Sequence, residues 1–211
     1  MHQRKALPAR IRMRTRARTR PAGPRRPHRV RAVAAILAVL SALALNLLTA
    51  GSSQARADAV YDALLYNYTT HKCLDVPDYG APDMGSIVQQ HDCIRGDGDN
   101  QMWDLVDGVD GYLIQNVKNR GLCLDLPGTG VPGNSTVGFY PCQDTTADNQ
   151  LWYPIWDSAG RAFLLVNASS YKADRPVCLD VAGLADGADD LRVGVYTCST
   201  SYGDDHWWQV A

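Results

Sequence analysis

The sequence predicts an all-β domain built from three internal repeats that share one core. Two observations lead to this prediction, and both are phrases that recur. The first phrase ends in Trp and occurs as "DNQMW" (99–103), "DNQLW" (148–152) and the altered "DDHWW" (204–208). The second phrase is "CLDV" or "CLDL" and begins at Cys73, Cys123 and Cys178. A third observation agrees with them, because no helical periodicity of apolar residues is found after residue 58.

The two phrases keep a nearly constant spacing. From the Asp of each CLD to the Trp that closes the other phrase, the separations are 28, 27 and 28 residues. A second cysteine follows the first after 20, 19 and 20 residues, at Cys93, Cys142 and Cys198. Only the third repeat is longer, with "SSYKADRP" inserted before its CLD. We therefore place the repeats at about 62–107, 110–157 and 160–211.

Each repeat reads as short strands separated by turns. The segments "SIVQQHDC", "STVGFYPC" and "LRVGVYTC" are rich in β-branched and aromatic residues and are bounded by Gly and Pro. Apolar lead-in segments also align, as "ALLYNY", "YLIQNV" and "FLLVNA". A unit of this size cannot bury its apolar face alone, so the three units must share a core. Antiparallel strands closed around a pseudo-threefold axis meet that need and hide most sheet edges.

Residues 1–57 have the features of a secretory signal peptide. They contain thirteen Arg and Lys and no acidic residue, and an apolar run extends from Ala32 to Ala50. The following Ala55-Arg56-Ala57 has the small-x-small pattern of a cleavage site, so we expect cleavage after Ala57. An uncleaved membrane anchor is the alternative. Either Met1 or Met13 could be the true start.

The remaining residues, 58–211, are strongly acidic. They keep 8 of the 21 basic residues and all 22 acidic ones, every one an Asp, which gives a net charge of −14. Such a surface disfavours nucleic acid and anionic lipid, whose binding requires Lys and Arg. All six cysteines lie here, an even number that is typical of disulfides in an exported chain. We expect a secreted, extracellular monomer with no nucleic-acid partner and no stable membrane association after cleavage.

Three CLD elements, each followed by Gln-x-Trp or a variant of it, resemble the ricin B-type lectin domain, a β-trefoil. They are also similar to the xylan-binding modules of bacterial glycosidases. The resemblance covers residues 66–210, and it departs in the third repeat, where Asp205 and His206 replace Asn and Gln. It implies a β-trefoil lectin domain over residues 58–211, with carbohydrate as the partner.

The tryptophans and cysteines of the repeats are interpreted as structural. We expect Trp103, Trp152 and Trp208 to fill the shared core, because each recurs at the end of a strand. The repeat also selects one disulfide per unit, namely Cys73–Cys93, Cys123–Cys142 and Cys178–Cys198. A zinc site is the alternative for these cysteines, but no Cys-x-x-Cys occurs and export favours oxidation.

The aspartates of the CLD elements are candidates for sugar binding. They are Asp75, Asp125 and Asp180. On a strand, the preceding Leu can point into the core while the Asp points out. A carboxylate held in this way accepts charge-assisted hydrogen bonds from two sugar hydroxyls. The alternative is that each Asp only closes the turn that follows it.

The resemblance implies two further partners for each Asp. The position two residues before the second cysteine supplies a ring for stacking on the sugar: His91, Tyr140 and Tyr196. The residue before Gln-x-Trp supplies a polar group: Asn100, Asn149 and Asp205. In the first repeat Gln89 can add a hydrogen bond. Gln101 and Gln150 belong to the candidate set, although we expect them mainly to tie the preceding loop to backbone groups.

The three candidate sites differ in completeness. The second repeat has the full set of Asp, Tyr and Asn, whereas the first has His91 as its ring. In the third repeat Asp205 can only accept hydrogen bonds and lies near a second carboxylate, so that site is expected to be altered or inactive. The acidic segments 97–100 and 186–190 lack the ligand spacing of a calcium loop. We therefore expect neither a metal nor a cofactor.

These features predict a secreted, non-catalytic carbohydrate-binding protein. Its shallow sites would bind galactose- or xylose-type sugars weakly and act together on multivalent ligands. Catalysis is not expected, because the chain has no Glu and no Asp pair set apart from the repeats. Two alternatives remain: a protein-binding trefoil scaffold or inhibitor, and an accessory binding module of a polysaccharide-degrading system.

Overall fold

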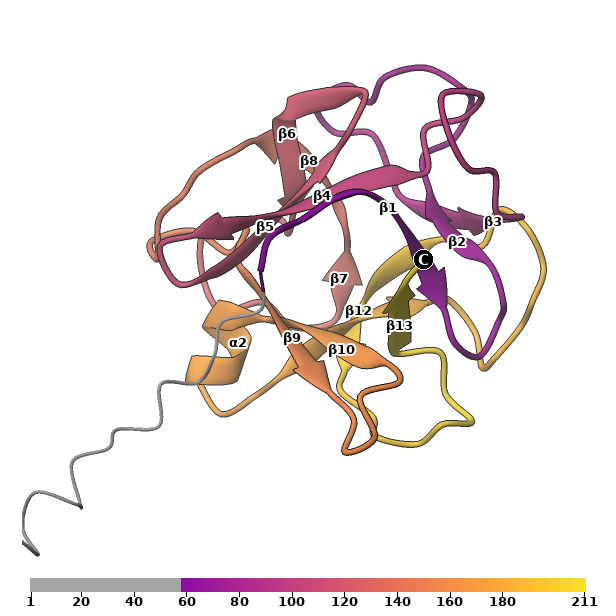
Figure 1. Cartoon of the computed structure of the whole chain (residues 1–211). Coiled ribbons are helices and arrows are strands. Elements are labelled where there is room, and N and C mark those ends of the chain that lie inside the picture. The colour runs from indigo at the N-terminus through magenta and orange to yellow at the C-terminus, as the bar shows by residue number, and fades with distance from the viewer. Residues whose placement is uncertain (1–57) are drawn as a thin grey trace, which may run out of the picture. The chain divides into compact units, whose positions relative to one another are not determined.

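Six strands form a closed barrel in the computed structural model, which describes residues 58–211. They are β1 (Val60–Asn67), β4 (Met102–Gly108), β5 (Gly111–Asn116), β9 (Trp152–Trp156), β10 (Phe163–Asn167) and β13 (Trp207–Val210). Each pairs antiparallel with the next, and β13 returns to pair with β1. Figure 1 shows this ring in a view close to its axis. The signal-peptide prediction and the choice between Met1 and Met13 fall on residues 1–57, outside the described residues.

Three hairpins complete the fold, one in each repeat. They are β2 (Cys73–Asp75) with β3 (Gln89–His91), β6 (Asn119–Asp125) with β8 (Gly138–Pro141), and β11 (Val177–Val181) with β12 (Val193–Thr197). Every repeat thus gives two strands to the barrel and one hairpin. This arrangement confirms the predicted all-β trefoil with pseudo-threefold symmetry. The short strand β7 (Ser135–Thr136) of the second repeat pairs with β12 of the third.

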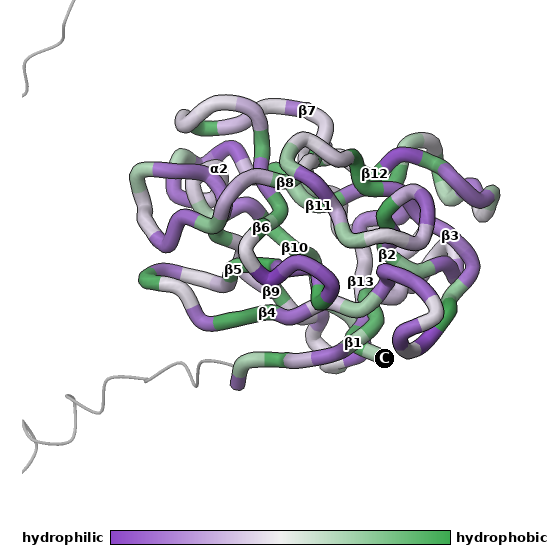
Figure 2. Tube along the Cα trace, turned by 90° about the horizontal axis from the view of Figure 1, so that it is seen from above, coloured by the Kyte–Doolittle hydropathy of each residue, from purple (hydrophilic) through white to green (hydrophobic). Residues whose placement is uncertain are grey.

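The repeated tryptophans form the centre of the core, as predicted. Trp103, Trp152 and Trp208 are all fully buried. Each indole Nε1 donates a hydrogen bond to the carbonyl of the CLD leucine in its own repeat, at Leu74 (3.0 Å), Leu124 (3.4 Å) and Leu179 (3.0 Å). Each Trp therefore joins a barrel strand to the hairpin that carries the candidate site. Hydrophobic residues recur along the barrel strands, as Figure 2 shows, and in β10 four successive apolar residues are buried.

The disulfides also follow the repeat. The bonds Cys73–Cys93, Cys123–Cys142 and Cys178–Cys198 are all present, which confirms the predicted pairing. Each closes the loop between the two strands of one hairpin. In the chain-entropy account, a loop of this length contributes about 3 kcal/mol to stability.

Three buried asparagines join the repeats to one another. Asn67, Asn116 and Asn167 end the first barrel strand of each repeat and are fully buried. Their Nδ2 atoms donate to the carbonyls of Asp205, Asn100 and Asn149, each of which belongs to the preceding repeat in the ring. Their Oδ1 atoms accept hydrogen bonds from backbone N–H groups of the turn that follows. The loops before Gln-x-Trp are therefore fixed by a neighbouring repeat.

The sequence inserted in the third repeat forms a short helix, α2 (Ala168–Lys172). Asn167 caps it by accepting a hydrogen bond from the backbone N–H of Ser170 (3.3 Å). The sequence shows no helical periodicity here, because a helix of five residues is too short to produce one. Within residues 58–211, no helix has the length and hydrophobicity needed to cross a membrane.

Candidate functional site

Strand pairing places the CLD aspartate and its ring on one face of each hairpin. In the second repeat, Asp125 lies opposite Gly138, and Cys123 lies opposite Tyr140. The other two hairpins have the same register. Residues that oppose each other in an antiparallel pair project to the same face, and diagonal neighbours are about 7–8 Å apart. Asp125 and Tyr140 are diagonal neighbours of this kind, and the Tyr140 side chain is exposed.

The residue opposite the aspartate distinguishes the first repeat from the other two. Gly138 and Gly194 face Asp125 and Asp180, whereas Gln89 faces Asp75. The Gln89 amide donates to Asp75 Oδ2 (2.8 Å) and to an Asp190 carboxylate oxygen (3.1 Å). Asp75 is consequently only 4% exposed. The predicted extra hydrogen bond from Gln89 is thus already made within the protein, and the first site is covered.

A neighbouring repeat forms one side of each site. Its closeness explains why the residue opposite the aspartate is Gly in the second and third repeats. A Cβ atom at Gly194 would lie 2.6 Å from the Ser135 carbonyl oxygen, and one at Gly138 would lie 3.3 Å from the Ser86 carbonyl oxygen. Isolated bridges join Ile87 to Gly138 and Gln89 to Arg192. Each hairpin therefore meets the chain of another repeat beside its aspartate.

The asparagines before Gln-x-Trp hold the turn that follows each CLD. Asn100 and Asn149 are each 1% exposed. Their Oδ1 atoms accept from the backbone N–H groups of Val76 (3.2 Å) and Leu126 (3.3 Å). Their Nδ2 atoms donate to two backbone carbonyls each, in the turns 78–80 and 128–130. No free amide hydrogen is left for the predicted sugar contact, so we interpret both residues as positioning groups.

The glutamines of Gln-x-Trp tie the preceding loop to backbone groups, as expected. Gln101 and Gln150 are fully buried, and their Oε1 atoms accept from the backbone N–H groups of Ile94 and Gln143, both at 2.8 Å. Their Nε2 atoms donate to backbone carbonyls of Asp92 (2.9 Å) and Pro141 (3.2 Å). Both tie the loop before them to the end of the hairpin.

A second aspartate, which is not among the predicted site residues, lies near each CLD carboxylate. These residues are Asp99, Asp148 and Asp204, the first letters of the repeated phrase. Each Oδ1 accepts from the backbone N–H of the next residue, at 2.7, 2.8 and 3.0 Å. The recurrence of this Asp in all three repeats could have identified it, but an acidic residue in a turn is common and does not by itself indicate a site.

Burial raises the pKa of both Asp75 and Asp125 to about 6. Repulsion from Asp99 and Asp148 acts in the same direction, and hydrogen bonds from Gln89 and Gln150 oppose it. At neutral pH both carboxylates are therefore ionised, yet they titrate in mildly acidic solution.

Replacing Asp125 with Asn is expected to raise the free energy of unfolding at pH 7.5 by about 1–2 kcal/mol. The folded chain binds the Asp125 proton more tightly than the unfolded chain does, since the pKa rises from 3.8 to about 6. Ionisation of Asp125 therefore costs stability above pH 6, and this cost disappears as the pH falls below 4. Urea unfolding at pH 7.5 and pH 4 measures the effect. The exposed Asp97→Asn serves as control and should show no such difference.

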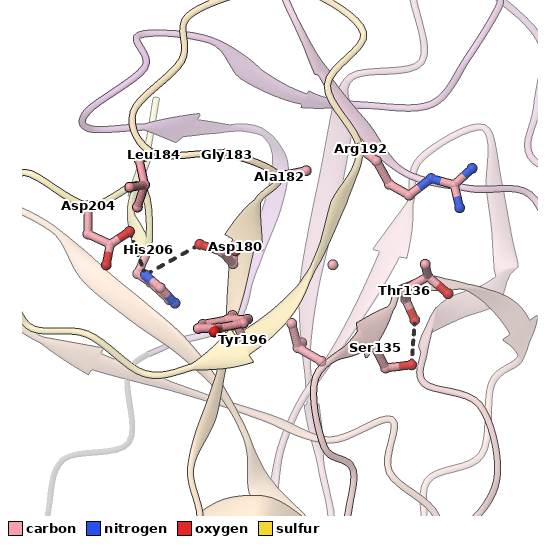
Figure 3. Close-up of a pocket in the computed structure, with 12 residues that line it drawn as sticks. Ser135, Thr136, Asp180, Ala182, Gly183, Leu184, Arg192, Tyr196, Asp204 and His206 are labelled. Atoms are coloured by element: carbon pink, nitrogen blue, oxygen red, sulfur yellow. Dashed lines mark hydrogen bonds and ion pairs between the residues drawn. The ribbon is translucent and has the colours of Figure 1, made fainter.

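The third repeat contains a pocket of about 400 Å³ at the same place on its hairpin. Asp180, Tyr196 and Arg192 line it, together with Ser135 and Thr136 of the second repeat (Figure 3). Burial, followed by the adjacent carboxylates of Asp205 and Asp204, raises the pKa of Asp180 to about 8. The third site therefore differs from the second in both charge and shape.

The sequence of the chain matches the model of the ricin-type β-trefoil lectin domain-like family over residues 52–137 and 99–196. The chain belongs to this family. The fold and the three equivalent hairpins described above are therefore those of a ricin-type lectin-like domain. Comparison with curated proteins found no match.

Solved structures show the same fold. The designed threefold-symmetric protein ThreeFoil is 26% identical, with a TM-score of 0.57, 71% of this chain covered and 96% of that chain. The C-half of an earthworm R-type lectin, solved with GalNAc, is 15% identical, with a TM-score of 0.51 and coverage of 72% and 98%. A ricin B-like lectin of Macrolepiota procera, solved with lactose, is 15% identical, with a TM-score of 0.52 and coverage of 70% and 92%.

Proposed function

We propose that this protein is a secreted, non-catalytic lectin that binds a neutral sugar at Asp125 and Tyr140 of the second repeat. One observation carries the proposal. The exposed Tyr140 ring and the Asp125 carboxylate share one face of the β6–β8 hairpin, and the residue opposite Asp125 is Gly138, which has no side chain to cover the carboxylate. Gln89 covers the equivalent carboxylate in the first repeat.

The chemistry of this pair suits a sugar. An ionised carboxylate accepts hydrogen bonds from two neighbouring hydroxyls, and such charge-assisted bonds are stronger than neutral ones. The Tyr140 ring provides an apolar face for the C–H side of the sugar, worth about 0.5–1.5 kcal/mol by analogy with aromatic pairs. Asn149 and Gln150 fix the turn and the loop around the carboxylate. A single site of this kind is expected to bind at about millimolar concentration.

The comparisons support a galactose-type ligand as the first class to test. Two lectins of the same fold were solved with GalNAc and with lactose. Residues 58–211 carry a net charge of −14, from 8 basic and 22 acidic residues, which favours neutral glycans over sulfated or sialylated ones. The three disulfides are typical of an extracellular protein.

A glycan array probed with the purified protein at pH 7.5 tests this proposal. We expect binding to neutral glycans that end in galactose, N-acetylgalactosamine or xylose, with the signal rising with glycan density because single sites are weak. The proposal would be rejected by an array on which no neutral glycan gives a signal above that of a disulfide-reduced sample.

A further inference from the structure

The third repeat gathers four potential metal ligands, of which two, Asp205 and His206, have no acidic or imidazole counterpart in the other repeats. They are Asp180 at the hairpin and Asp204, Asp205 and His206 before β13. One ligand atom from each lies within 4.8 Å of the others. Figure 3 shows His206 between the carboxylates of Asp180 and Asp204, with dashed lines to both.

Two of these side chains are buried and carry polar atoms that have no hydrogen-bond partner among the described residues. His206 is 2% exposed, and neither Nδ1 nor Nε2 makes a hydrogen bond. Asp205 is fully buried, and its Oδ1 also lacks a partner, although its Oδ2 accepts from the backbone N–H of Ala185 (2.9 Å). Buried polar atoms in folded proteins nearly always have a partner, because leaving one unpaired costs about 1–3 kcal/mol. These atoms therefore point to a missing ligand at this position.

We propose that Asp180, Asp204, Asp205 and His206 form a binding site for a divalent transition-metal ion, with Zn²⁺ as the best match. Imidazole nitrogen is a common ligand of Zn²⁺, whereas Ca²⁺ and Mg²⁺ select oxygen ligands. Tetrahedral Zn²⁺ with bonds of about 2.0–2.1 Å separates its ligand atoms by about 3.3–3.4 Å. His206 Nδ1 lies 3.4 Å from Asp180 Oδ1 and 3.3 Å from Asp204 Oδ1.

The other repeats supply an internal comparison. Where the third repeat has Asp205 and His206, the second has Asn149 and Gln150, whose amides are bonded to backbone groups. The change of two adjacent residues thus replaces two side chains that bond to the backbone with two potential metal ligands. An entry path exists as well, because Asp180, Asp204 and His206 line the pocket. The site differs from the sequence-based expectation of no metal, since it uses neither a Cys-x-x-Cys motif nor the ligand spacing of a calcium loop.

Calorimetric titration of the metal-stripped protein with ZnCl₂ tests the site. We expect one Zn²⁺ per chain with a Kd in the micromolar range or tighter, and a thermal midpoint that rises by about 5 °C or more at 100-fold excess over Kd. His206→Gln and Asp205→Asn each restore the residue of the second repeat, so both should fold, and each should weaken Zn²⁺ binding at least tenfold. The exposed His71→Asn is the control and should bind as the wild type does.

Three results would overturn the proposal. They are no Zn²⁺ binding below about 1 mM, unchanged binding in both variants, and Ca²⁺ binding of equal affinity that survives His206→Gln. Near-UV circular dichroism of both variants shows whether the trefoil core is intact, so that loss of binding is not confused with unfolding. Cysteine cannot supply the site in residues 58–211, because all six cysteines are in disulfides. The test is independent of sugar binding at the second repeat.

Discussion

Trp152→Ala is expected to lower the free energy of unfolding by about 3–5 kcal/mol, enough to unfold a large fraction of the protein near its working temperature. Trp152 is fully buried at the centre of the barrel, and its indole donates to the Leu124 carbonyl of the β6–β8 hairpin. The substitution therefore creates a cavity and also leaves a buried carbonyl without its partner. Denaturant unfolding monitored by circular dichroism measures the loss.

Trp156→Ala is the matched control, because Trp156 lies on the same strand but is 47% exposed. We expect a loss of less than about 1 kcal/mol there. If Trp152→Ala is too unstable to purify, Trp152→Phe keeps most of the volume and should show an intermediate loss. Equal stability of Trp152→Ala and Trp156→Ala would contradict the assignment of the repeated tryptophans to the shared core.

Asp125→Ala is expected to reduce the affinity for the sugar found on the array at least tenfold, without loss of thermal stability. Two charge-assisted hydrogen bonds to hydroxyls would be lost, and each such bond is worth about 1.5–3 kcal/mol. Removing a carboxylate whose ionisation burial disfavours should leave the fold as stable as before or more so. Tyr140→Ala should weaken binding about three- to tenfold, since it removes the stacking contribution alone. Affinity chromatography on the immobilised sugar measures both losses.

Asp75→Ala provides the comparison within the same protein. Gln89 covers the Asp75 carboxylate, so this variant should lose much less retention than Asp125→Ala does. The opposite order, with Asp75→Ala more damaging than Asp125→Ala, would move the principal site to the first repeat.

The repeats made the fold and its structural residues predictable. Residues of the core, the disulfides and the loop ties recur at a fixed spacing because they serve the same structural role in each unit that carries them. In this chain, each Trp fills the centre of the core, each cysteine pair closes one hairpin, and each Gln ties its loop to backbone groups. The spacing also placed each CLD aspartate near its ring, because the period of two along a strand fixes the face.

Which side chains are free to bind a ligand at each site was less predictable, because this depends on contacts between repeats. Asn100 and Asn149 use their amides within the turn after CLD, and sequence alone does not tell an inward amide from an outward one. Gln89 reaches Asp190, which lies 101 residues away in the chain. The cluster around His206 combines two residues that depart from the repeat, Asp205 and His206, with two that follow it, Asp180 and Asp204. Departures of this kind appear in the sequence as losses of a motif, and only the spatial arrangement shows that they create a different set of ligands.

Titration of the isotope-labelled protein with the array-selected sugar, followed residue by residue by NMR, locates the sugar site. We expect the largest shifts at Asp125, Leu126 and Tyr140, with smaller changes around Asp75. A titration in which these second-repeat signals stay fixed while signals elsewhere move would contradict the assignment of the sugar site to Asp125 and Tyr140.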